Sequence, residues 1–129
     1  MKHNLWNLVA NIKNGYVAKK LEIEVRRNKS CENLLNLLWN EGYISGFKIK
    51  TNDSYMINVF LKYNSEGTPA LKSIKSVSKP SKRVFLTTKQ LWKIDSSRTN
   101  AVFSTTHGFL TLAECKKKNV GGIVLFVLL

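Results

Sequence analysis

The chain has 129 residues, 43% of them hydrophobic and 22% charged, which suits one folded unit or two small halves and is too apolar for a disordered chain. Twenty-one lysines and arginines against eight aspartates and glutamates give a formal net charge of +13 at pH 7. This excess predicts a polyanionic partner, in the first place nucleic acid and in the second an anionic membrane surface. No apolar segment is long enough to predict a membrane-spanning helix.

Two amphipathic helices are expected in the first half. Apolar residues recurring at helical spacing predict a helix over residues 3–14, and Gly15 is expected to end it in a left-handed conformation. A second helix is expected to begin after Ser30, as its N-cap, and to end at Gly42.

Three strands are expected in the same half, over residues 20–25, 44–50 and 54–62. The element order is then α-β-α-β-β. This order predicts two helices on one face of a small antiparallel sheet.

The polar, breaker-rich segment 64–69 predicts a boundary inside an α/β (α+β) fold. The expected subdomains are residues 1–66 and residues 67–129. The second is expected to be mostly β, with strands over residues 71–77, 83–87, 101–105 and 123–129.

Short helices complete the second half. Residues 88–92 are expected to form one helical turn, and Thr111 and Glu114 have the spacing of a capping box. Lysines 116–118 would then lie at the negative end of the helix dipole. The pair Gly121-Gly122 is expected to allow a sharp reversal into the last strand.

Catalytic chemistry is not expected. Ser104 and His107 are close in sequence, but no G-x-S-x-G elbow, paired carboxylates, P-loop or dinucleotide fingerprint accompanies them. Cys31 and Cys115 fit no metal-binding spacing and are expected to be buried, inert thiols. The sequence therefore predicts a protein without metal, cofactor or small-molecule substrate.

Basic clusters and a run of hydroxyls predict RNA binding instead. The clusters lie at residues 19–20, 26–29, 79–83 and 116–118, where they can contact phosphates. Between them, Ser104, Thr105 and Thr106 precede His107 and Gly108. Hydroxyls donate and accept, so they can read base edges or a 2′-OH. By itself the run also suits an ordinary hairpin end.

The order of several short motifs resembles the S-eight family of small-subunit ribosomal proteins. The matching segments, in chain order, are I-K-N-G at 12–15, E-G-Y-I at 41–44, L-K-Y at 61–63, S-K-P-S-K-R at 78–83, S-T-T-H-G at 104–108 and V-G-G at 120–122. Each is weak by itself, and six in order make chance similarity improbable.

The resemblance implies a structural constituent of the small ribosomal subunit that binds the central domain of its RNA and helps to fold it, next to other ribosomal proteins. It places Ser104, Thr105, Thr106 and Gly108 on a base-reading loop, and we include the adjacent His107. It places Lys29, Lys79 and Arg83 on backbone-contacting positions. A repressor that binds a messenger RNA mimicking the ribosomal site is the alternative.

Two departures from the family pattern concern the expected RNA site. Ile123 stands where the family usually has glutamate, and Phe85 where a tyrosine is usual. We therefore expect weaker recognition of the RNA bases, and a larger contribution to binding from contacts between basic residues and the RNA phosphates. The altered signature and the bias toward lysine and asparagine indicate a mitochondrial ribosome, with a plastid or a bacterial cytoplasm as alternatives.

Overall fold

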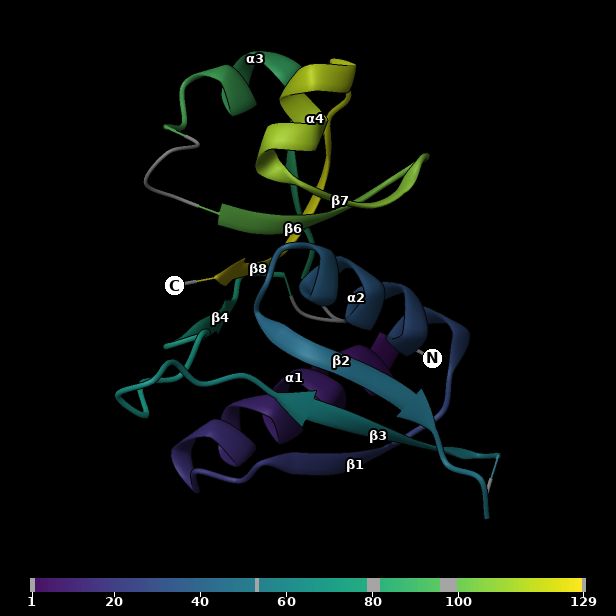
Figure 1. Cartoon of the computed structure of the whole chain (residues 1–129). Helices are drawn as coiled ribbons and strands as arrows, with labels where there is room; N and C mark the ends of the chain where they lie inside the picture. The colour runs from purple at the N-terminus through teal and green to yellow at the C-terminus, as the bar shows by residue number, and fades with distance from the viewer. Residues whose placement is uncertain (1, 53, 79–81, 96–99, 129) are drawn as a thin grey trace. The chain divides into compact units, whose positions relative to one another are not determined.

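The computed structural model describes residues 2–52, 54–78, 82–95 and 100–128, which form four helices and eight strands in two antiparallel sheets (Figure 1). The predicted α+β fold class is confirmed. Contacts divide the chain into two compact units, residues 1–72 and 73–129. The division falls six residues beyond the sequence-based boundary at 66/67 because Pro69 bridges back to Tyr63 and the Ala70 amide donates to the Lys62 carbonyl at 2.9 Å.

The N-terminal unit has the predicted order of elements. Their bounds are α1 Lys2–Val17, β1 Glu22–Arg26, α2 Lys29–Asn40, β2 Ile44–Ile49 and β3 Met56–Leu61. The strands pair antiparallel in the order β1-β3-β2, and both helices pack against this sheet. Buried and exposed residues alternate along β1, as expected for a sheet with one covered face.

Gly15 does not end α1, contrary to the expectation. The helix continues to Val17, and Lys19 takes the left-handed conformation with φ 57°. The Lys20 amide then donates to the Gly15 carbonyl at 2.9 Å, as in a Schellman motif. Gly15 instead allows close packing, since a Cβ there would lie 2.8 Å from Ile23 Cγ2.

The C-terminal unit has one five-stranded sheet. Its elements are β4 Ile74–Ser76, β5 Val84–Leu86, α3 Thr88–Trp92, β6 Asn100–Thr105, β7 Gly108–Thr111, α4 Leu112–Lys118 and β8 Gly122–Leu128. The last strand is central: β6 pairs with it on one side, and β4 and β5 pair with it at successive positions.

The core of this unit lies between the sheet and the two short helices. Leu91 of α3 and Leu112 and Cys115 of α4 are at most 1% exposed, and they pack with Phe103 and Val124 of the sheet. The predicted capping box of Thr111 and Glu114 is confirmed. A second box, which we did not predict, caps α3 with Thr87 and Gln90.

The reversal before β8 is made by Asn119 and not by the double glycine. Asn119 caps α4 in a left-handed conformation with φ 54°. Neither Gly121 nor Gly122 has a positive φ. The expectation that the double glycine makes this reversal was therefore wrong. The two residues are small because backbone atoms of other segments lie close to them.

Candidate nucleic-acid interface

Residues 104–108 form the hairpin end between β6 and β7, here named the hydroxyl hairpin (Figure 1). Thr105 pairs with Gly108, so Thr106 and His107 are the two residues between the strands. Gly108 has φ +94°, which a residue with a side chain adopts only under strain. The glycine therefore closes this turn, and the side chains of Thr106 and His107 are exposed.

The hydroxyl group of Thr105 makes hydrogen bonds within the turn. Its Oγ1 donates to the Gly108 carbonyl at 2.9 Å and accepts from the His107 amide at 3.1 Å. The three consecutive hydroxyls are therefore not equivalent. Thr105 shapes the turn, whereas Thr106 is exposed and Ser104 is half-buried.

Ser104 lies in an otherwise apolar row across the sheet. Strand registers place these residues opposite one another: Phe85, Ile123, Ser104 and Phe109. Residues paired in this way point to the same face of an antiparallel sheet. The next row contains Phe103 and Val124, which face the core, so the row with Ser104 occupies the other face.

This row contains both departures from the family pattern. Ile123 is the direct neighbour of Ser104 on β8, and Phe85, 60% exposed, is the neighbour of Ile123 on β5. Apolar side chains therefore occupy both of these positions in the row that contains Ser104.

The double glycine brings β8 against the ends of β5 and β6. A Cβ on Gly122 would lie 2.7 Å from the Ser104 carbonyl oxygen and 2.7 Å from Thr105 Cγ2. A Cβ on Gly121 would lie 2.6 Å from the Leu86 carbonyl oxygen. A side chain at either position would clash with the backbone of a neighbouring strand, so both residues have to be small for the strands to pack this closely.

Arg83 lies in the same unit, exposed and directly before β5. Ser78, earlier in the chain, is fully buried. The Ser78 hydroxyl donates to the Val124 carbonyl and accepts from the Val84 amide at 2.9 Å. Lys79, the other predicted contact of this loop, lies outside the described residues.

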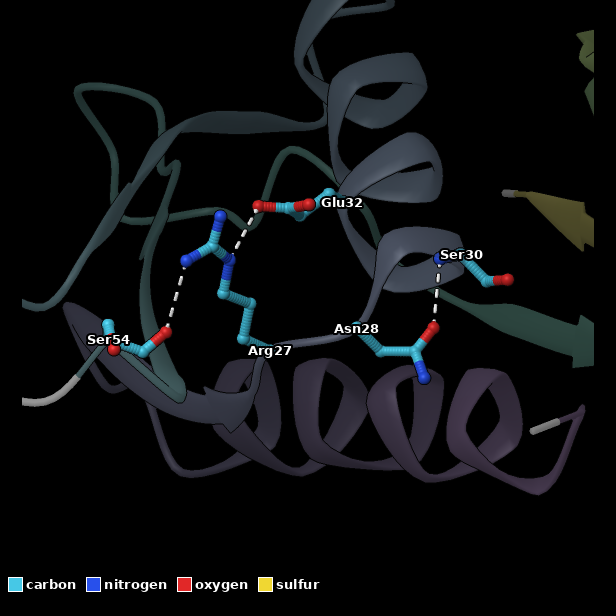
Figure 2. Close-up of polar contacts among 5 residues, drawn as sticks. All are labelled: Arg27, Asn28, Ser30, Glu32 and Ser54. Atoms are coloured by element: carbon cyan, nitrogen blue, oxygen red, sulfur yellow. Dashed lines mark hydrogen bonds and ion pairs between the residues drawn. The ribbon is translucent and has the colours of Figure 1, made fainter.

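Lys29 belongs to the N-terminal unit, where it is the exposed first residue of α2. Asn28, and not Ser30, is the N-cap: its Oδ1 accepts from the Ser30 amide at 2.9 Å (Figure 2). Arg27 points away from this cap, with Nε 3.2 Å from Glu32 and Nη1 3.2 Å from the Ser54 carbonyl. The cluster at residues 26–29 therefore offers Arg26 and Lys29 to solvent and holds Arg27.

The family model for ribosomal protein S8 matches residues 3–128, across both units. The chain belongs to the ribosomal protein S8 family. Similar proteins named small ribosomal subunit protein uS8 come from Novosphingobium aromaticivorans (37% identical; 97% of this chain, 95% of the relative) and Chlamydia trachomatis serovar L2b (32%; 92% and 90%). One from Acanthamoeba castellanii, named uS8m, is 36% identical over 92% of both chains.

The family is one of ribosomal proteins and not an enzyme class. In the described ranges no three His, Cys, Asp or Glu side chains are grouped so as to hold a metal ion, and no helix is long and apolar enough to cross a membrane. Cys31 and Cys115 are buried, as predicted. Burial raises the pKa of the Cys115 thiol to about 11 and also raises the pKa of Cys31. Both thiols are therefore poor nucleophiles at neutral pH.

Three contributors to this surface were missed from the sequence. No pattern in the sequence indicates Phe109, Ser78 belongs to the motif at 78–83, and Gly122 is expected only to allow a reversal. A buried serine and a glycine without positive φ have no local signature, since their roles depend on strands distant in the chain. Phe109 could have been found from the register of a hairpin closed by Gly108.

Proposed function

We propose that this protein is a structural constituent of the small ribosomal subunit that binds small-subunit ribosomal RNA and helps to fold and assemble it. The observation that carries the proposal is the hydroxyl hairpin, which presents Ser104 and Thr106 at one end of a rigid sheet. Names of the relatives support the assignment to the small subunit.

Binding combines two physical terms. Exposed basic residues such as Arg83, Lys29 and Arg26 lower the repulsion between phosphates and release counterions, whatever the RNA sequence. The hydroxyls of Ser104 and Thr106 discriminate, because they donate and accept at base edges and at the 2′-OH of an irregular RNA. RNA that is bound through both kinds of contact can adopt fewer alternative conformations. This restriction favours the folded conformation of the RNA.

We infer further that the protein belongs to a mitochondrial ribosome. Neighbouring ribosomal proteins are expected to contact it there. The inference is supported by the bias of the composition and by the Acanthamoeba relative, whose name uS8m denotes a mitochondrial protein. Fractionation of cells that express the tagged protein decides it, since recovery with plastid or cytoplasmic ribosomes would contradict a mitochondrial location.

Replacing Arg83 by alanine is expected to weaken binding to the small-subunit RNA at every salt concentration and to leave sequence preference unchanged. Loss of one phosphate contact reduces the slope of log affinity against log salt by about 0.7–0.9. Filter binding between low and moderate salt measures the slope, with the RNA central domain and an unrelated RNA of equal length as ligands.

The matched control is Lys13→Ala, which removes the same charge from an exposed position of α1. Its slope is expected to equal that of the wild type. Equal slopes for Arg83→Ala and the wild type would remove Arg83 from the interface. Equal affinity of the wild-type protein for the two RNAs would contradict the proposed function.

A further inference from the structure

The outer surface of α3 and α4 carries a second group of basic residues, here named the lysine face. Leu91, Leu112 and Cys115 point into the core, so the opposite sides of both helices face solvent. The face consists of the exposed Lys89, Trp92, Lys93 and Lys117 and the half-buried Lys116, with Lys118 at the end of α4. Lys89 and Lys93 are four residues apart and hence on one side of their helix.

The charge of this region is strongly unbalanced. Residues 88–95 and 112–118 contain five lysines against Asp95 and Glu114, an excess of three positive charges. Glu114 is engaged in the capping box, where its Oε1 accepts from the Thr111 amide at 3.2 Å. Lys117 and Lys118 are exposed, so their charges are available to an anionic partner.

Trp92 is the unusual member of the face, because 58% of a large aromatic side chain is exposed. It is also held in place: Lys116 Nζ lies 5.6 Å from the centroid of its ring and donates to the Ile94 carbonyl. A cation over the ring favours this orientation of the indole. The site therefore combines a fixed aromatic surface with lysines on both helices.

This face differs from the one that carries Ser104. The helices cover the side of the sheet that contains Phe103 and Val124, whereas Ser104 and Ile123 belong to the alternate row. A ligand on the lysine face therefore does not compete for the surface beside Ser104.

We propose that the lysine face is a second RNA-binding surface, on which an unpaired nucleotide stacks on Trp92 while Lys89, Lys93 and Lys117 contact the flanking phosphates. The combination of an exposed aromatic ring and surrounding lysines is the one that single-stranded nucleic acid requires. An acidic protein would use the charges and would have no need of a planar ring. With RNA on both faces, the C-terminal unit brings two segments together.

The test uses the full chain and a fluorescent single-stranded RNA of about eight nucleotides, a length within the usual site size for such surfaces. Fluorescence anisotropy at low salt measures the affinity of the wild type and of Trp92→Leu. Leucine keeps apolar surface and removes the stacking ring, so affinity is expected to fall about tenfold. Lys117→Ala is expected to lower the salt slope by about 0.7.

Trp39→Leu is the matched control, since Trp39 is 50% exposed in the other unit. Equal binding of the Trp92 and Trp39 variants would overturn the proposal, as would equal Trp92-dependent binding of an acidic peptide. Ser104→Ala tests this surface separately from the proposed function. It should lower the affinity for the central-domain RNA and leave the affinity for the oligonucleotide unchanged. Loss of oligonucleotide binding in Ser104→Ala would place both ligands on one site and overturn a second surface.

Discussion

Replacing Gly122 by alanine is expected to destabilise the C-terminal unit and to weaken RNA binding together. The new Cβ would lie 2.7 Å from the Ser104 carbonyl oxygen, and a backbone atom cannot swing aside as a long side chain can. Either β8 or the end of β6 must move, at a cost of about 1–3 kcal/mol in the free energy of unfolding. Since that movement displaces the hydroxyl hairpin, RNA affinity is expected to fall at least about tenfold, equivalent to 1.4 kcal/mol.

Urea unfolding and RNA titration measure the two effects of Gly122→Ala. Gly67→Ala is the control, because Gly67 has φ +84° and nothing within 4 Å of an added Cβ. Strain in the left-handed region should cost it about 1 kcal/mol of stability and leave RNA affinity unchanged. Wild-type RNA affinity in Gly122→Ala would show that the hairpin does not depend on the close approach of β8.

Replacing Ser104 by alanine is expected to weaken binding to the small-subunit RNA by about 5- to 150-fold, equivalent to 1–3 kcal/mol, with stability unchanged. Ser104 is only half-buried at the end of β6, so its replacement removes little from the packing of the free protein. In the complex, Ile123 and Phe109 on either side keep water from replacing it. An RNA base that loses its hydrogen bond to Ser104 in this apolar row is still removed from water, and this desolvation costs binding free energy.

Ser76→Ala is the matched control for Ser104→Ala, since Ser76 is an exposed serine on β4 of the same sheet. It is expected to bind RNA as the wild type does. Equal loss in the two variants would indicate a general effect of serine on the sheet. No loss in Ser104→Ala would leave the hairpin without a base-reading role.

Local patterns predicted much of the fold. Alternation predicted β1 and β3, helical spacing predicted α1 and α2, and the spacing of Thr111 and Glu114 predicted the start of α4. Such patterns depend on residues within a few positions of one another, so the sequence displays them. The choice between two capping residues that lie two positions apart is harder to predict, and the cap of α2 is Asn28 where Ser30 was expected.

Glycines were the main source of error because their roles are tertiary. Gly15 and Gly122 were read as sites of unusual φ, whereas each is small because another strand approaches it. The sequence near Gly15 contains no sign of Ile23 lying 2.8 Å from an added Cβ. Gly108 does lie at a hairpin end, the ordinary structure that its segment also suited, because a turn between two short apolar strands is a local feature.

The candidate site was predicted as a segment and not as a geometry. Residues 104–108 do form one hairpin end, in which 106–108 are exposed and 104–105 are half-buried. That Thr105 holds the turn is visible only from its hydrogen bonds. The proximity of Phe85 and Ile123 to Ser104 follows from pairing of β5, β8 and β6, which lie far apart in the chain.

Site-directed crosslinking from Thr106 tests most directly whether the hydroxyl hairpin contacts ribosomal RNA. Thr106→Cys gives a thiol that is exposed, while the native Cys31 and Cys115 are 2% and 0% exposed, so a photoreactive reagent attaches at the chosen position. Assembled into small subunits and irradiated, this variant is expected to crosslink to an irregular segment of the small-subunit RNA. Ser65→Cys, exposed in the N-terminal unit, should not crosslink to that segment. Crosslinks from position 106 to protein and not to RNA would contradict an RNA-reading hairpin.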